Sequence, residues 1–415
     1  MSLGIFLRAP TLNVHPEKVR AKEQDLLVSN KRKMIKEIYL DNASTTKIDP
    51  IVLRAMLPFL GGQYGNASSP HTLGENAKKA IKEARSIIAN SISADLSEIV
   101  FTSGGTESNN FAIKGITFAN KDRGNHIITT KIEHPSVLEV YKWLEEQGFE
   151  ITYIETDKYG FVNPDDLDRA INNRTILVSI IHGQNEFGTI QDLGALGHVC
   201  KKHNVYFHTD ACQSYTKTEI NVRKQAIDLI TLNAHKIHGP KGVGALYIRK
   251  GTKIMAWQHG GGQERRSRSG TENIAGIVGF GKAVELALDK KHIENIRGLK
   301  NMLIEELIKI PRVKINGPRD EGGLPNIVNA VFFGVEGEAI VGLLDVEKIF
   351  VATGSACSSN KLEPNPALIA IGLMPQEVNS TVRFSLSRFN AEKDIKKLLV
   401  KLPEIVGKLR RISPF

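Results

Sequence analysis

Residues 205–236 read VYFHTDACQSYTKTEINVRKQAIDLITLNAHK and hold two short apolar runs, each of which passes directly into polar residues. The first run, residues 205–207, leads into His208-Thr209-Asp210, and the second, residues 229–232, leads into Asn233-Ala234-His235-Lys236. Short apolar runs bounded by polar residues are typical of buried strands. We therefore expect two strands whose ends present an aspartate and a lysine, Asp210 and Lys236.

Similar apolar runs flank this stretch and alternate with helical stretches. They occur at residues 99–102, 126–128, 151–154 and 176–181, while residues 77–88 carry apolar side chains at helical spacing. Strands that alternate with helices indicate crossover connections and a mostly parallel sheet covered on both faces. The sequence therefore predicts an α/β fold.

The pattern of expected elements changes near residue 290, where a long charged helical stretch leads into fewer strands and a helical C-terminus. We expect a large α/β domain over residues 46–290 and a smaller α+β domain from residues 36–45 plus 291–415. Residues 1–35 show no periodicity and are expected to form an extension. A flexible basic arm is expected there; an anchor or targeting element, and a true start at Met34, are the alternatives.

Composition excludes several classes of protein. The 415 residues are 41% hydrophobic, and because no run of eighteen apolar residues occurs, we expect no membrane contact. The net charge of +10 is spread along the chain and interleaved with acids, so direct nucleic-acid binding is not expected. Three cysteines are too few for a disulfide framework, which favours a reducing, cytoplasmic setting, with organellar targeting by the extension as the alternative.

A segment suited to an anion follows the run at residues 99–102. It reads Ser103-Gly104-Gly105-Thr106-Glu107-Ser108 and is expected to open a helix. Glycines let a backbone approach closely, free N–H groups at a helix start suit a phosphate, and Thr106 adds a hydroxyl. An ordinary turn and helix cap would have the same composition, so both interpretations stay open.

Asp210 and Lys236 together favour a cofactor with a pyridine ring. Open parallel sheets bind ligands beyond the carboxyl ends of their strands, so both side chains are expected at one edge. A lysine can form an imine with an aldehyde, and a carboxylate keeps a pyridine nitrogen protonated and electron-withdrawing. A loop-capping aspartate and a lysine on a surface turn are the alternatives.

Further motifs follow one another along the chain: Tyr39-Leu40-Asp41-Asn42-Ala43-Ser44-Thr45-Thr46, Tyr64-Gly65-Asn66, Glu133-His134, Asn185-Glu186, Gly260-Gly261-Gly262-Gln263-Glu264-Arg265, Arg268-Ser269-Gly270-Thr271-Glu272-Asn273 and Thr353-Gly354-Ser355-Ala356-Cys357-Ser358-Ser359. Together with the Asp–Lys pair they resemble the cysteine desulfurases of the NifS/IscS group, which are class-V, fold-type-I pyridoxal-phosphate-dependent enzymes. The resemblance runs roughly from residue 38 to the C-terminus. It implies a mostly parallel seven-stranded sheet and a smaller α+β domain that carries the cysteine loop.

The resemblance implies a role for each site residue. Lys236 is similar to the Schiff-base lysine, His134 to the imidazole stacked on the cofactor ring, and Asp210 to the partner of the pyridine nitrogen. Gln213 and Asn185 would lie near the phenolic oxygen and the substrate. Arg383 matches the arginine that grips the substrate carboxylate, a bidentate role that a planar guanidinium fits. The residues implied at the phosphate are Gly105, Thr106, His235 and, from a neighbouring subunit of a homodimer, Thr271.

Two positions depart from the pattern of the family. Asn233 stands where a serine usually contacts the phosphate, and since an amide can also donate a hydrogen bond, the site is expected to be altered rather than lost. Ala67 replaces a common proline after Gly-Asn, with only a local effect expected on that turn.

Cys357 distinguishes among transamination, elimination and desulfuration, which the same cofactor supports. It lies among small residues in a segment expected to be mobile, where a thiolate can reach a substrate sulfur and then a partner. A buried apolar role is the alternative, and it is the one expected of Cys200. Cys212 is expected near the cofactor in a space-filling role.

The implied reaction converts L-cysteine to L-alanine and leaves the sulfur on Cys357 as a persulfide. Lys236 or His134 would move the α-proton. An iron–sulfur scaffold protein or a tRNA-thiolation protein would accept the sulfur, and no metal site is expected. The alternatives are a selenocysteine lyase or cysteine sulfinate lyase on the same cofactor, a sulfur-trafficking or scaffold component without turnover, and a structural or nucleic-acid-binding protein.

Overall fold

The computed structural model describes residues 37–354 and 364–412. By its backbone contacts the chain divides into Met1–Glu37 and Ile38–Phe415. All helices and strands of the described residues belong to the second unit. The expected extension, residues 1–35, and Cys357 lie outside the described residues.

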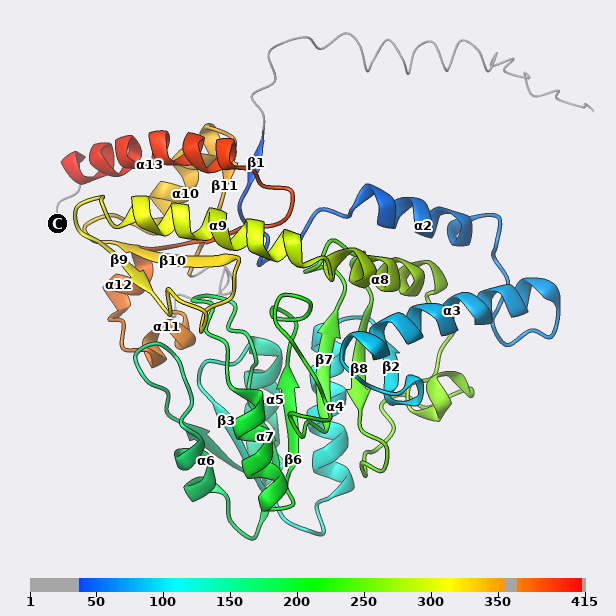
Figure 1. Ribbon diagram of the computed structural model, residues 1–415. Helices are drawn as coiled ribbons and strands as arrows, with labels where there is room; N and C mark the ends of the chain where they lie inside the picture. The colour runs from blue at the N-terminus through cyan, green and yellow to red at the C-terminus, as the bar shows by residue number, and fades with distance from the viewer. Residues whose placement is uncertain (1–36, 355–363, 413–415) are drawn as a thin grey trace, which may run out of the picture. The chain divides into compact units, whose positions relative to one another are not determined.

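A seven-stranded sheet, in the order β2-β8-β7-β6-β5-β3-β4, forms the centre of this unit (Figure 1). Its strands are β2 (Ile99–Thr102), β3 (His126–Thr130), β4 (Glu150–Ile154), β5 (Thr175–Ser179), β6 (Tyr206–Asp210), β7 (Leu229–Asn233) and β8 (Gly244–Ile248). Strand β8 is antiparallel to both of its neighbours, and the pairs from β7 to β4 are parallel. The predicted fold class, α/β with a mostly parallel seven-stranded sheet, is confirmed.

Three details of the strands differ from the expectation. Strands β6 and β7 continue to Asp210 and Asn233, so these two polar residues end the strands rather than begin the loops. Strand β5 ends at Ser179, two residues before the end of the expected run 176–181. Strand β8 was not among the expected strands; it follows the turn at residues 239–242 and pairs back on β7.

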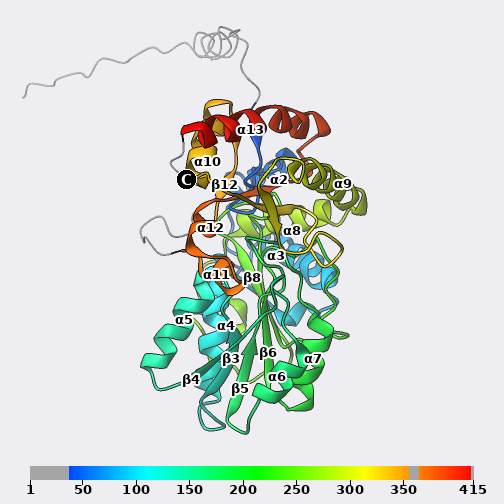
Figure 2. The same ribbon diagram turned by 90° about the vertical axis from the view of Figure 1, so that its left-hand side faces the viewer.

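Helices cover both faces of the sheet. Ile127, Leu177 and Leu229 pack on the face covered by α4 (Gly105–Ala119) and α5 (Pro135–Glu146). The residues that follow each of them, Ile128, Val178 and Ile230, pack on the opposite face, against α3 (Thr72–Ser91), α6 (Pro164–Ala170), α7 (Leu193–Lys202) and α8 (Ile274–Ala287). Figure 2 shows α4 and α5 on one side of the strands and α6 and α7 on the other. Because successive strand residues point to opposite faces, continuous apolar runs are required here.

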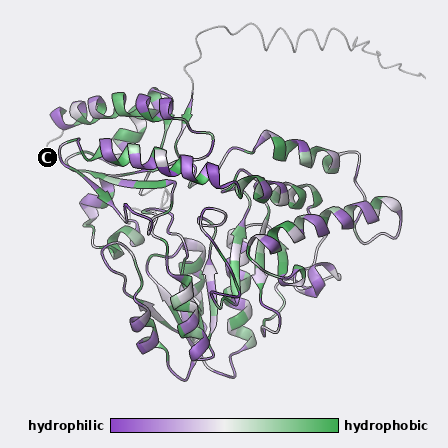
Figure 3. Cartoon of the chain, viewed as in Figure 1, coloured by the Kyte–Doolittle hydropathy of each residue, from purple (hydrophilic) through white to green (hydrophobic). Residues whose placement is uncertain are grey.

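A second, antiparallel sheet has the order β12-β13-β10-β9. It consists of β9 (Val313–Asn316), β10 (Ile327–Phe332), β12 (Ala352–Thr353) and β13 (Thr381–Ser385). One face packs on α9 (Lys290–Leu307), α10 (Gly337–Val346) and α13 (Glu392–Ile412), and the other on α11 (Pro366–Ala370) and α12 (Pro375–Asn379). Purple and green residues alternate along α9 and α13 in Figure 3, as expected of amphipathic helices.

The chain before α2 (Pro50–Leu60) crosses between these two sheets. Strand β1 (Ile38–Tyr39) pairs in parallel with β11 (Ile349–Phe350). Thr46 then donates its backbone N–H to the carbonyl of His235 at 2.9 Å, and His238 N donates to Thr46 Oγ1 at 2.8 Å. These bonds hold residues 41–49 at the carboxyl end of β7. The division of this unit into a large and a small domain stays a prediction.

Candidate active site

A cavity of about 410 Å³ lies at the carboxyl ends of the parallel strands, where open α/β sheets bind their ligands. Residues that follow β2, β3, β5, β6 and β7 line it. Arg383 of β13 (Thr381–Ser385) also lines it, so the lining includes most of the site residues expected from the sequence, namely Gly105, Thr106, His134, Asn185, Asp210, Gln213, Asn233, His235, Lys236 and Arg383. Thr271 does not line the cavity and is exposed. Its expected role is a contact with the phosphate bound in a neighbouring subunit.

A chain of hydrogen bonds leads from Asp210 to His134. Asn109 Nδ2 donates to Asp210 Oδ2 at 2.7 Å and to Ser136 Oγ at 2.8 Å, and Ser136 Oγ lies 2.8 Å from His134 Nδ1. Because Ser136 Oγ accepts from Asn109, we assign its own proton to the bond with His134. The buried carboxylate and the imidazole are therefore held in fixed positions relative to one another.

His134 is held as a neutral imidazole with a defined tautomer. Burial lowers the pKa of His134; the charge of Lys236 adds to this effect and the charge of Asp210 opposes it. At the N-terminus of α5, His134 Nδ1 also accepts from the backbone N–H of Ser136 at 3.1 Å. Since Nδ1 is an acceptor, the proton of the neutral ring lies on Nε2.

The start of α4 offers an anion site beside Asn233. No side chain caps this helix at Gly104, and the first N–H groups of a helix have no partner within the helix. A Cβ atom on Gly105 would lie 2.6 Å from Cys212 Sγ and 3.6 Å from Asn233 Nδ2. Cys212 therefore packs closely against Gly105, and its space-filling role stays a prediction.

Two lysines lie close together beside β7. Lys236 Nζ donates to the carbonyl of Ala43, and Lys217 Nζ donates to the carbonyl of Gln213 at 2.6 Å. Both line a second cavity of about 40 Å³. Burial, and next the charge of Lys236, lower the pKa of Lys217 to about 7. Lys217 was not singled out in the sequence, because only the fold brings it close to Lys236.

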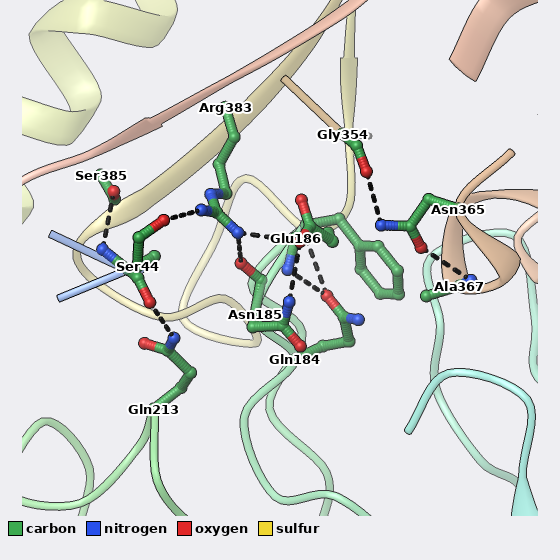
Figure 4. A network of polar contacts seen from close by, with 12 residues as sticks. Ser44, Gln184, Asn185, Glu186, Gln213, Gly354, Asn365, Ala367, Arg383 and Ser385 are labelled. Atoms are coloured by element: carbon green, nitrogen blue, oxygen red, sulfur yellow. Dashed lines mark hydrogen bonds and ion pairs between the residues drawn. The ribbon is translucent and has the colours of Figure 1, made fainter. Parts of the chain in front are cut away.

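Arg383 lies in the middle of β13, is 1% exposed, and is surrounded by acceptors (Figure 4). Nη1 donates to Glu186 Oε1 at 2.8 Å and to the carbonyl of Asn185 at 3.1 Å. Nη2 donates to Ser44 Oγ at 2.8 Å and to Asp41 Oδ1 at 3.1 Å. Asp41, Ser44 and Glu186 belong to motifs noted in the sequence, but their contacts with Arg383 were not predicted.

Buried polar atoms at the cavity suit a polar ligand. Asn109 Oδ1, Gln213 Oε1 and Asn233 Oδ1 have no hydrogen-bond partner among the described residues, although all three side chains line the cavity. Such atoms are normally paired in folded proteins. Asn109 could have been found in the sequence, because it follows Gly105 by one helical turn and so shares its side of α4.

Known proteins are similar to this chain in sequence and in fold. The family model for the class-V aminotransferases matches residues 38–398, which places the chain in that class of enzyme. A cysteine desulfurase IscS of Methanosarcina thermophila is 49% identical over 381 residues, which cover 91% of this chain and 94% of the relative. The chain belongs to the cysteine desulfurase family, and the resemblance expected from its motifs is confirmed.

Solved structures agree with this assignment. A NifS-like protein superimposes with a TM-score of 0.85 at 36% identity, covering 90% of this chain and 100% of that one. A structure described as SspA in complex with cysteine superimposes with a TM-score of 0.76 at 35% identity, covering 86% of this chain and 100% of the other. Among the described residues, no helix has the length and apolar character needed to cross a bilayer.

Proposed function

We propose that the protein converts L-cysteine to L-alanine and holds the removed sulfur on Cys357 as a persulfide. The observation that carries this proposal is the meeting of Lys236, Asp210 and Arg383 around one cavity. An amine for an aldehyde, a carboxylate for a ring nitrogen and a guanidinium for a carboxylate are the groups that an amino-acid substrate and pyridoxal phosphate require. The relatives named cysteine desulfurase support the same reaction.

The residues around the cavity fit pyridoxal phosphate. Lys236 would hold its aldehyde, and Asp210, fixed by Asn109, would hold the ring nitrogen. Residues that can donate to the phosphate are Gly105, Thr106, Asn233 and His235, with Gln213 and Asn185 near the phenolic oxygen. When bound, the cofactor supplies an electron-withdrawing ring that stabilises negative charge at the substrate α-carbon.

Each side chain at the site would then have its own role in the reaction. Arg383 orients the substrate carboxylate, and Asn185 lies beside it. Lys236 or the neutral His134 moves the α-proton. The Cys357 thiolate attacks the substrate sulfur, so a sulfur–sulfur bond forms and the carbon–sulfur bond breaks. The carbon keeps the electron pair of that bond and takes a proton, which completes L-alanine.

The other cysteines are poorly suited to this attack, which supports Cys357. The chain has three cysteines. Burial raises the pKa of Cys200 and of Cys212 well above the ordinary value, so both thiols stay protonated, and the nearby carboxylates of Asp228 and Asp210 add to this effect. Ala352, in the same run of chain as Cys357, pairs with Arg383 in the small sheet. The last described residues before Cys357 therefore lie close to the residue that would hold the substrate.

We place the enzyme in the cytoplasm, because a thiolate nucleophile requires a reducing compartment. An iron–sulfur scaffold protein or a tRNA-thiolation protein would accept the sulfur.

We assign the cysteine loop to a small domain made of residues 36–45 and 291–415, and the cofactor to a large domain of residues 46–290.

The function is tested by supplying the purified holoenzyme with L-cysteine, L-selenocysteine and L-cysteine sulfinate in turn. We expect L-alanine at the highest kcat/KM from L-cysteine, with sulfide released when a thiol reductant is present. L-alanine from selenocysteine alone would identify a selenocysteine lyase, and from the sulfinate alone a sulfinate lyase. No L-alanine from any of them, in protein that binds the cofactor, would indicate a sulfur-trafficking component without turnover.

We propose a homodimer, with the exposed side of α2 in the interface. Five apolar side chains on α2 and just beyond it are 41–77% exposed: Ile51, Leu53, Leu57, Leu60 and Tyr64. Exposed apolar patches of this kind mark interaction sites, and a second copy would also bring the exposed Thr271 toward another cavity.

Replacing Leu57 and Leu60 by aspartate should convert the dimer to a monomer, because two buried charges would lie in the interface without partners. Sedimentation should give about twice 45.8 kDa for the wild type and one chain mass for the variant. The matched control is Val400→Asp on α13, which is 71% exposed and should stay dimeric. A wild type that sediments as a monomer would contradict the proposal.

A further inference from the structure

Arg383 has acceptors for all four N–H bonds of its two terminal nitrogens. Nη1 donates to Glu186 and Asn185, and Nη2 donates to Asp41 and Ser44. A carboxylate that binds a guanidinium edge-on needs two of its N–H bonds. A substrate carboxylate can therefore bind Arg383 in this way only if one of the present acceptors leaves.

The charges around Arg383 add to this conflict. One guanidinium lies between the carboxylates of Glu186 and Asp41, at 2.8 and 3.1 Å. The substrate brings another negative charge to the same cation, and like charges in a partly buried site repel one another strongly. Burial raises the pKa of Glu186, while the charge of Arg383 opposes the shift. Tyr39, which also lies near, has a pKa raised to about 12, chiefly by burial, and stays neutral.

The two carboxylates differ in how readily they can leave. The Glu186 side chain is 2% exposed, whereas that of Asp41 is 21% exposed and can turn toward water. The Asp41 carboxylate also accepts from the Ser44 hydroxyl, which donates to Asp41 Oδ1 at 2.7 Å. Ser44 on the Nη2 side and Asn185 on the Nη1 side both line the cavity, so the greater exposure of Asp41 makes Nη2 the side that a ligand can free.

We propose that Asp41 holds the place of the substrate carboxylate on Arg383 until L-cysteine displaces it. Glu186 stays on Nη1 and fixes the plane of the guanidinium. Asp41 is thus a positioning residue that lowers substrate affinity and keeps Arg383 paired between turnovers. The inference rests on the proposed function in one respect, the assignment of Arg383 to the substrate carboxylate.

The test compares the Asp41→Asn holoenzyme with the wild type. Asparagine keeps an oxygen acceptor for Ser44 and Arg383 but removes the charge that competes with the substrate. The KM for L-cysteine should fall about fivefold, as expected for the loss of one partly exposed ion pair, while kcat stays within about twofold. A purely structural role would lower kcat or leave KM unchanged.

Binding of two amines that carry no sulfur, and so cannot be desulfurated, isolates the carboxylate. By calorimetry, L-alanine should bind Asp41→Asn about fivefold more tightly than wild type, whereas ethylamine, which lacks the carboxylate, should bind both equally. Asp49→Asn is the matched control, since Asp49 pairs with Arg388 at 2.7 Å and does not line the larger cavity; it should change neither affinity. Asp41→Ser repeats the test with a smaller neutral side chain if the asparagine variant folds poorly.

The outcomes separate this inference from the proposed function. Unchanged or weaker L-alanine binding in both Asp41 variants, or equal tightening for ethylamine, would overturn the inference. A wild type that makes no L-alanine from L-cysteine would overturn the proposed function, and tighter L-alanine binding by the variants would then still support the displacement of Asp41.

Discussion

Replacing Lys236 by alanine should remove covalently held cofactor and lower the release of L-alanine from L-cysteine by at least about 10³-fold. Lys236 lines the cavity. Two residues further along the chain, His238 N donates to Thr46 Oγ1, in the segment after β1, and this bond helps to hold Lys236 in place. Alanine has no side-chain amine and so cannot form an imine with the aldehyde of the cofactor. The measurement is borohydride reduction of the wild type and the variant, followed by intact mass and peptide mapping.

Lys217 supplies the control for this experiment. It lies beside Lys236, and its pKa of about 7 leaves much of the amine neutral and reactive near neutral pH. The Lys217→Met protein should still carry the reduced cofactor on Lys236. A Lys236→Ala protein that retained a stoichiometric, active cofactor would contradict the assignment, as would a cofactor mapped to Lys217 in the wild type.

The second large effect is expected at Cys357. The Cys357→Ala protein should keep the yellow absorbance of the bound cofactor and release sulfide from L-cysteine only at the background rate. The chain would still bind the substrate through Arg383 but would have no thiolate to take the sulfur. The measurement combines the absorbance spectrum of the purified variant with sulfide release in the presence of a thiol reductant.

Cys200 and Cys212 are the matched controls for Cys357. Cys200 is 1% exposed, and Cys212 packs against the site of Gly105, so their alanine variants test thiols that burial keeps protonated. Both variants should release sulfide at a rate comparable to that of the wild type. Wild-type sulfide release by Cys357→Ala, or its loss in Cys200→Ala alone, would contradict the mechanism.

The sequence predicted those parts of the fold that local patterns determine. Continuous apolar runs bounded by polar residues located β2, β3, β6 and β7, because strands buried on both faces must be apolar throughout. Strand β8 was missed, since its apolar residues follow a glycine-rich turn and its antiparallel pairing with β7 depends on the whole sheet.

For the candidate site, too, the sequence predicted what local patterns determine and missed what depends on contacts between distant segments. Asp210 and Lys236 were expected because each lies at the carboxyl end of a strand, and those ends meet at one edge. The path from Asp210 through Asn109 and Ser136 to His134 joins three separate elements, so no spacing along the chain reveals it. The contacts of Asp41 and Glu186 with Arg383 were missed for the same reason, since they depend on how the two sheets pack.

The most direct test of the proposed reaction follows the substrate sulfur. Purified holoenzyme is mixed with one equivalent of L-cysteine labelled in sulfur, without reductant, and its peptides are then mapped by mass spectrometry while L-alanine is quantified. We predict labelled persulfide on the peptide that contains Cys357 and an equal amount of L-alanine. L-alanine formed with no label on Cys357, or label found instead on Cys200 or Cys212, would contradict it.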